Sequence, residues 1–170
     1  MSEPDLSTEM TADRRTDDFA EFVHSAEPLL RRALGAAYGA SVGREAALDA
    51  LSWGWEHWDR LSRMTNPIGY LYRVGQTRAS EHFARQARFA EFDDESRLPV
   101  ADPVVADPEL PAALRALSAQ QRVAAVLVHG YGVPLREAAE LMDVSVATVR
   151  KHCERAMRHL RVALEASDAR

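Results

Sequence analysis

The chain has one cysteine, Cys153, among its 170 residues. One thiol excludes an internal disulfide framework and is typical of a protein from a reducing cytosol. No apolar run is long enough to cross a membrane, and the first ten residues, MSEPDLSTEM, are too acidic and polar for a signal peptide. We therefore expect a cytoplasmic protein, and an apolar content of 46% supports buried cores.

The chain also lacks the alternation of apolar and polar residues that marks a strand, and it has no internal repeats. The sequence therefore predicts an all-α fold. Metal-ligand spacings are missing as well, because the six histidines form no HExxH motif and no paired clusters with cysteine. Glu56-His57 and Glu81-His82 are isolated pairs, and we interpret their histidines as surface residues rather than metal ligands. We predict no catalytic site, no metal and no cofactor, and hence no enzyme.

Charge divides the chain into four blocks. The net charge of −5 is concentrated in residues 1–18, which carry −4, and in residues 91–110, which carry −6. Residues 19–90 carry +2 and residues 111–170 carry +3. The stretch from Phe92 to Pro111 also has four prolines, so it should bury little and stay extended. We predict two small helical domains on either side of a flexible acidic linker, bounded as follows: a disordered tail at 1–18, domains at 19–90 and 111–165, the linker at 91–110, and a short tail at 166–170.

The segment from Leu135 to Leu160, LREAAELMDVSVATVRKHCERAMRHL, is typical of a helix-turn-helix. Its first helix is expected at Leu135–Met142. Asp143 then falls where the chain must turn, and aspartate tolerates a left-handed backbone. Ser145 is a suitable N-cap for the second helix.

The second helix has two faces when it is phased at about 100° per residue. One face is apolar and should be buried; it contains Val149, Cys153, Ala156, Met157 and Leu160. The opposite face is basic, as expected for a helix that enters the major groove of DNA. We predict that the side chains contacting duplex DNA are Thr148, Arg150, Lys151, Arg155 and Arg158.

The N-terminal domain carries a second basic segment. A loop over residues 60–66 ends at Pro67, a favoured first helical residue. The following helix, to Arg88, interleaves aromatic residues with arginine, a combination that suits single-stranded nucleic acid but also occurs in helices whose aromatic side chains are simply core. An earlier helix, from about Arg44 to Leu61, holds three tryptophans within six residues, so at least one should lie on the surface.

Together these features resemble a bacterial RNA polymerase sigma factor of the extracytoplasmic-function (ECF) group. Leu117–Arg122 resembles the family's opening L-(S/P)-x-x-x-R, and Val133–Leu160 resembles its helix-turn-helix signature. Glu45–Trp55 and Pro67–Arg85 resemble its region 2 motifs. Three positions depart from the pattern: the family's glutamine is Leu48, its tryptophan is Tyr70, and its late asparagine is Thr77.

The resemblance implies two domains, region 2 and region 4, that join core RNA polymerase and direct promoter-specific transcription initiation. Region 4 reads the upstream promoter element as duplex DNA, while region 2 captures the melted downstream element; an anti-sigma factor is a further partner such a protein can have. The expected contacts with the downstream element are Arg60, Arg63, Asn66, Tyr70, Arg73, Gln76, Thr77 and Arg78. The expected contacts with polymerase are Glu45, Asp49, Trp55 and Glu56.

One alternative remains open at this point. Regulators of the LuxR type end in similar recognition helices and act without being polymerase subunits. They normally carry an N-terminal receiver or ligand domain that alternates strands and helices, and residues 19–90 show no strand pattern. The sigma factor interpretation is therefore favoured.

Overall fold

The structure, a computed structural model, describes the backbone of residues 6–90 and 110–168 and the side chains of residues 13–85 and 110–165. These parts of the chain are helical and contain no strand, which confirms the all-α prediction. We call residues 6–90 the N-terminal half and residues 110–168 the C-terminal half. The N-terminal half contains α1 (Leu6–Tyr38), α2 (Ala40–Glu56), α3 (Trp58–Leu61) and α4 (Pro67–Ala90). The C-terminal half contains α5 (Leu110–Ala116), α6 (Ala119–Ala125), the π-helical turn η1 (Val126–Gly130), α7 (Leu135–Met142) and α8 (Val146–Asp168).

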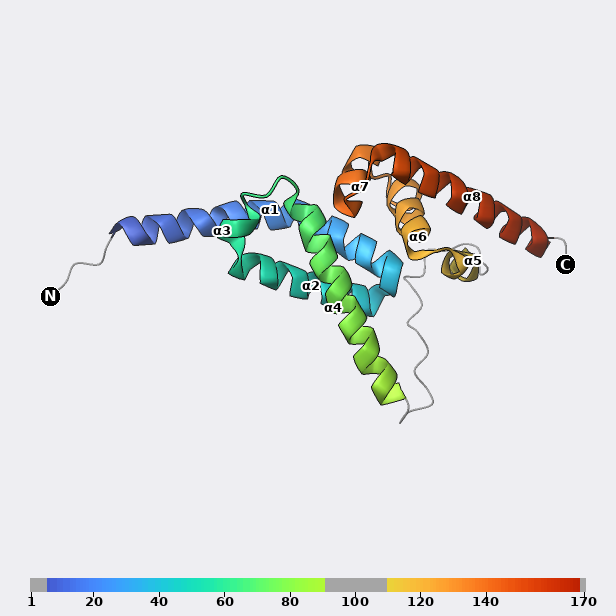
Figure 1. Cartoon of the computed structure of the whole chain (residues 1–170), viewed down its shortest axis with the longest axis horizontal. Coiled ribbons are helices and arrows are strands. Elements are labelled where there is room, and N and C mark those ends of the chain that lie inside the picture. Colours follow the sequence, from blue (N-terminus) through green and yellow to red (C-terminus); the bar gives the residue numbers. More distant parts are fainter. Residues whose placement is uncertain (1–5, 91–109, 169–170) are drawn as a thin grey trace.

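Figure 1 shows how the two halves are arranged. Helices α1, α2 and α4 pack on one another, while α5, α6 and α7 all pack against the long helix α8. The halves also touch each other, since α1 packs against α6 and η1, and α4 packs against α7. The end of α8 and the beginning of α1 project in opposite directions from this centre.

The beginning of α1 corrects one prediction. Residues 1–18 were expected to form a disordered tail, but α1 already begins at Leu6. Arg15 explains part of this difference, because its guanidinium donates a hydrogen bond of 2.8 Å to the main-chain carbonyl of Trp55 and lies 5.0 Å from the centre of the Trp55 ring. This contact joins residues 40 positions apart, so local charge could not reveal it. Residues 166–168, expected in a tail, likewise continue α8.

The helix predicted from about Arg44 to Leu61 is instead two helices, because the chain breaks at His57 between α2 (Ala40–Glu56) and α3 (Trp58–Leu61), and residues 60 and 61 of the predicted loop belong to α3. Gly39, whose φ is 88°, separates α1 from α2. Pro67 is the first residue of α4, as predicted. Gly43 lies where α1 and α2 cross, and a Cβ there would overlap the main chain of Gly35. Most of the predicted linker lies outside the described residues, and the domain boundaries remain predictions.

A single cluster of buried apolar residues runs through both halves of the chain. It includes Leu30 and Leu34 of α1, Leu71 of α4, and Leu127 and Leu141 of the C-terminal half. All five side chains are fully buried. A smaller cluster lies beneath α5 and contains Leu117, Ala125, Ala156 and Leu160. The two halves are therefore joined by a common core in this structure.

Arg122 connects the halves through the end of α1. Its guanidinium donates hydrogen bonds of 2.5 Å and 2.8 Å to the main-chain carbonyls of Ala36 and Ala37. These carbonyls belong to the last turn of α1, where no further helical N–H is available to them. A cation there is also favoured by the helix dipole. Burial lowers the pKa of Arg122 from its usual value, but the side chain remains charged at neutral pH because arginine starts so high.

Replacing Arg122 with alanine is expected to destabilise the protein by about 1–3 kcal/mol, because the carbonyls at the end of α1 lose their donors. Urea unfolding followed by circular dichroism measures the effect. The matched control is Arg115→Ala, which removes an exposed arginine from α5 and should change the free energy of unfolding by less than about 0.5 kcal/mol. Equal stability of the two variants would show that the Arg122 contact does not hold the halves together.

Candidate nucleic-acid interface

The helix-turn-helix in the C-terminal half is built as the sequence predicted. Helix α7 covers Leu135–Met142, and Asp143 follows it with φ 53° and ψ 47°, in the left-handed region. The Ser145 hydroxyl accepts a hydrogen bond of 3.1 Å from the Thr148 N–H and so caps α8. Ala139 and Val149 are buried where α7 and α8 meet. This turn fixes the direction in which α8 leaves the rest of the fold.

Helix α8 presents a basic face to solvent. The side chains of Arg150, Lys151, Arg155 and Arg158 are exposed, and Thr148 is half-buried beside the Ser145 hydroxyl, 2.8 Å away. The predicted inner face is buried as well, with the exception of Met157, which is 39% exposed. That prediction was wrong because Met157 lies at the edge of the apolar stripe, where the packing against α5 and α6 ends. Burial raises the pKa of the Cys153 thiol, as expected for an inward-facing cysteine.

Helix α3 and the loop that follows it carry two exposed cations and the Asn66 amide. Arg60 and Arg63 are exposed. The Asn66 carbonyl oxygen accepts a hydrogen bond of 2.9 Å from the Gly69 N–H and caps α4. The Asn66 amide nitrogen donates to the main-chain carbonyl of Glu140 at 2.8 Å and to the carboxylate of Asp143 at 3.2 Å. All the hydrogen-bonding capacity of its NH₂ group is thus directed at the C-terminal half.

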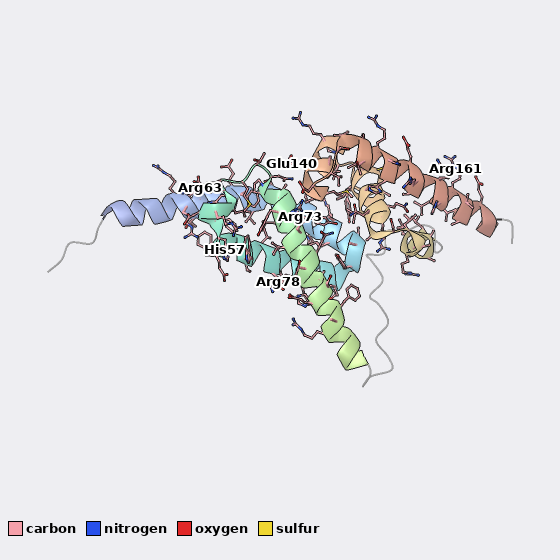
Figure 2. All side chains as sticks on the ribbon, in the orientation of Figure 1. His57, Arg63, Arg73, Arg78, Glu140 and Arg161 are labelled. Atoms are coloured by element: carbon pink, nitrogen blue, oxygen red, sulfur yellow. The ribbon has the colours of Figure 1, made fainter. Side chains whose placement is uncertain are left out.

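Along α4 the predicted side chains fall into different environments. Arg73 is exposed and forms an ion pair with the Asp143 carboxylate; Figure 2 shows Arg73 and Glu140 in the region where α4 meets α7. The Thr77 hydroxyl donates to the Arg73 carbonyl, and Arg78 pairs with Glu81 at 3.1 Å. Gln76 is half-buried. Only part of the predicted surface is therefore open to a nucleic-acid strand in this conformation.

The aromatic side chains of α4 are also divided. Tyr72 is 5% exposed and belongs to the core, and burial raises the pKa of its hydroxyl. Tyr70 is half-buried and lies 5.2 Å from Trp53, between ring centroids. Trp53 in turn stacks on His57, with centroids 4.2 Å apart and planes inclined by 10°. Trp53 and His57 were not predicted to contribute to a site, because their contact with Tyr70 depends on how α2 and α4 pack.

The outer face of α2 carries the side chains predicted to meet polymerase. Glu45 and Glu56 are exposed, and Trp55 is 40% exposed, while Trp58 is core, as the crowding of three tryptophans implied. Asp49 is half-buried and lies 2.9 Å from the ring of His82 on α4, which is also 3.5 Å from Glu45. Leu48 is 57% exposed beside them. Sequence reasoning treated Leu48 only as a departure from the family pattern, although an exposed leucine in this position adds apolar area to the same face.

The C-terminal half is similar to a known protein family. The model of the family described as "Sigma-70, region 4" matches residues 108–160. This stretch of 53 residues is thus similar to sigma-70 region 4. The match covers the helix-turn-helix and the basic face of α8.

The fold of the whole chain also resembles a solved sigma factor. The sigma factor RpoE, in a co-crystal structure with the anti-sigma factor NepR from Bartonella quintana, matches with a TM-score of 0.60. The two sequences are 20% identical, and the match covers 87% of this chain and 97% of that chain. No curated protein matches the sequence. At this level of sequence identity the likeness to RpoE shows a shared fold. No helix within the described residues has the length and apolar character that a membrane span requires.

Proposed function

We propose that this chain is a sigma factor that joins core RNA polymerase in the cytoplasm and directs promoter-specific transcription initiation. The region 4 match over residues 108–160 carries this proposal, because it falls on a helix-turn-helix whose second helix exposes a row of cations. In this scheme α8 enters the major groove of the upstream element. Lys151 and Arg155 are exposed cations four positions apart in the N-terminal half of α8, the part of such a helix that reaches base edges.

The N-terminal half supplies the surfaces for the other two steps. The exposed cations Arg60 and Arg63 can neutralise phosphates of a melted strand, and the half-buried ring of Tyr70 against Trp53 offers a face on which an unpaired base can stack. The outer face of α2, with Glu45, Leu48, Trp55 and Glu56, supports docking on polymerase. Exposed tryptophan at a protein surface is a frequent energetic centre of an interface.

An anti-sigma factor is a further partner that the comparison supports. RpoE was solved in complex with the anti-sigma factor NepR, and this chain shares its fold. We propose that the present chain is likewise held by an anti-sigma factor under some conditions.

Run-off transcription tests the proposed function directly. Core polymerase alone and core polymerase with the full chain are compared on genomic promoter fragments, and the chain should produce discrete transcripts that core polymerase alone does not. The competing function, a LuxR-type regulator, predicts a different result: nanomolar, sequence-specific duplex binding by the isolated chain and no initiation with bare core enzyme. The variant Arg150→Ala should lower transcript yield on every promoter if Arg150 contacts phosphate.

A further inference from the structure

The contact between α4 and α7 uses side chains that the proposed function assigns to DNA. We define the α4–α7 contact by three groups: the Asn66 amide, the Arg73 guanidinium, and the Asp143 carboxylate together with the Glu140 carbonyl that precedes it. Asn66 donates to both acceptors, at 2.8 Å and 3.2 Å, and Arg73 pairs with Asp143. A phosphate oxygen of a DNA strand would need the same donors. The Asp143 carboxylate therefore occupies the position of an anionic ligand on α4.

The close approach of α4 and α7 requires a glycine at position 69. Gly69 follows Asn66 in the first turn of α4, and a Cβ at this position would lie 2.9 Å from the Glu140 carbonyl oxygen and would also meet the Asn66 amide. Any other residue would have to push α7 away or displace the Asn66 side chain. The α4–α7 contact thus depends on three residues of α4 and its cap, and on the turn between α7 and α8.

The contact affects the two DNA-binding surfaces unequally. The outward residues of α8 point away from it, and Lys151 and Arg155 remain exposed. Asn66 and Arg73 are engaged instead. In this conformation the basic face of α8 is exposed, whereas the turn of the same helix-turn-helix occupies Asn66 and Arg73 of the strand-capturing surface and leaves Arg60 and Arg63 exposed.

We propose that the C-terminal half inhibits single-strand binding by the N-terminal half in the free chain, with Asp143 standing in for a DNA phosphate on Asn66 and Arg73. The proposal rests on the proposed function in assigning these donors to DNA. It supplies a physical reason why single-strand capture waits for polymerase: the two halves must separate at the α4–α7 contact before a strand can enter. The contact is suited to reversal, because the side chains of Arg73 and Asp143 are 65% and 36% exposed and such pairs stabilise only weakly.

The decisive variant is Asp143→Asn in the full chain. Asparagine keeps the left-handed backbone that residue 143 adopts and removes the charge that pairs with Arg73. The matched control is Glu140→Gln, which makes the same change in net charge three residues earlier. Glu140 enters the contact only through its main-chain carbonyl. A second test variant, Gly69→Ala, places a Cβ against the Asn66 amide and the Glu140 carbonyl and so disrupts the α4–α7 contact without changing charge.

Fluorescence anisotropy measures binding of a labelled twelve-nucleotide single strand and of a labelled duplex at fixed salt. Asp143→Asn and Gly69→Ala should bind the single strand about three- to tenfold more tightly than the parent, while Glu140→Gln matches the parent and duplex binding is unchanged in all three. Circular dichroism verifies that each variant is folded. If Asp143→Asn does not fold, Gly69→Ala still tests the proposal. With core polymerase present, the differences should disappear because the contact is already open.

Equal single-strand affinity of the parent and both test variants would overturn the proposal. So would a gain in Glu140→Gln as large as that in Asp143→Asn, because the effect would then be general electrostatics. Small-angle scattering reads the separation of the halves without DNA, and an unchanged radius of gyration in both variants counts against an opening. If the parent fails in run-off transcription, the sigma function is refuted. The inhibition by the C-terminal half is still tested separately, by the differences in single-strand binding and scattering between the parent and the variants.

Discussion

The double variant Lys151→Ala, Arg155→Ala is expected to lose recognition of the upstream promoter element. Both residues are exposed on the basic face of α8 and lie one helical turn apart. A lost base contact should cost about 1–3 kcal/mol and relax preference at one promoter position, whereas a lost phosphate contact should weaken all sequences alike. Anisotropy with promoter and scrambled duplexes distinguishes the two, and each phosphate contact removed should lower the log–log salt slope by about 0.9.

The matched control is Arg161→Ala. Arg161 is also exposed on α8, but it lies ten residues beyond Lys151, or about 15 Å along the helix axis; Figure 2 shows it toward the end of α8 that projects from the fold. It should change duplex binding by far less. If the double variant binds and transcribes like the parent, α8 is not the reading helix.

The second large effect is expected on the outer face of α2. Trp55→Ala and Leu48→Glu should each weaken association with core polymerase by about 2 kcal/mol or more, roughly 30-fold, if these two exposed apolar side chains form the centre of the interface. Co-purification of core enzyme with tagged chain measures the loss, and far-UV circular dichroism verifies the helical fold. The control is Val162→Ala, which shortens an even more exposed apolar residue on α8.

Two variants of this face are needed because Trp55 also has partners within the chain. Its ring lies 5.3 Å from that of Phe19 and beneath Arg15, so its replacement has some effect on α1. Leu48→Glu tests the same face through a side chain that is 57% exposed. Normal co-purification of both variants would place the polymerase contact elsewhere.

The helix-turn-helix could be predicted almost residue by residue because its determinants are local. The apolar spacing in α7, the left-handed Asp143 and the Ser145 cap each act within one or two turns of the chain. Pro67 marks the start of α4 for the same reason, since proline is favoured at a first helical position. Such signals need no knowledge of what packs against the segment.

The predictions that failed concern contacts between distant segments. Residues 6–18 are acidic and polar in sequence, yet they belong to a helix that Arg15 connects to the end of α2. Met157 has the phase of a core residue but lies where the packed surface ends. In each case the outcome depends on which surface another element covers, and periodicity carries no information about that.

The sequence by itself determined the all-helical class, the helix-turn-helix and the outward basic face of α8, because capping, turn chemistry and helical phase operate over a few residues. Only the tertiary structure decided that the two halves share one apolar core and that Arg122 caps α1 from the other half. It also decided that Asn66 and Arg73, which we predicted from the sequence to contact DNA, instead form a hydrogen bond and an ion pair with Asp143. Asn66 and Asp143 are 77 residues apart in the chain, and hydrogen bonding and charge pairing act through space, so their partnership depends on the packing of α4 against α7.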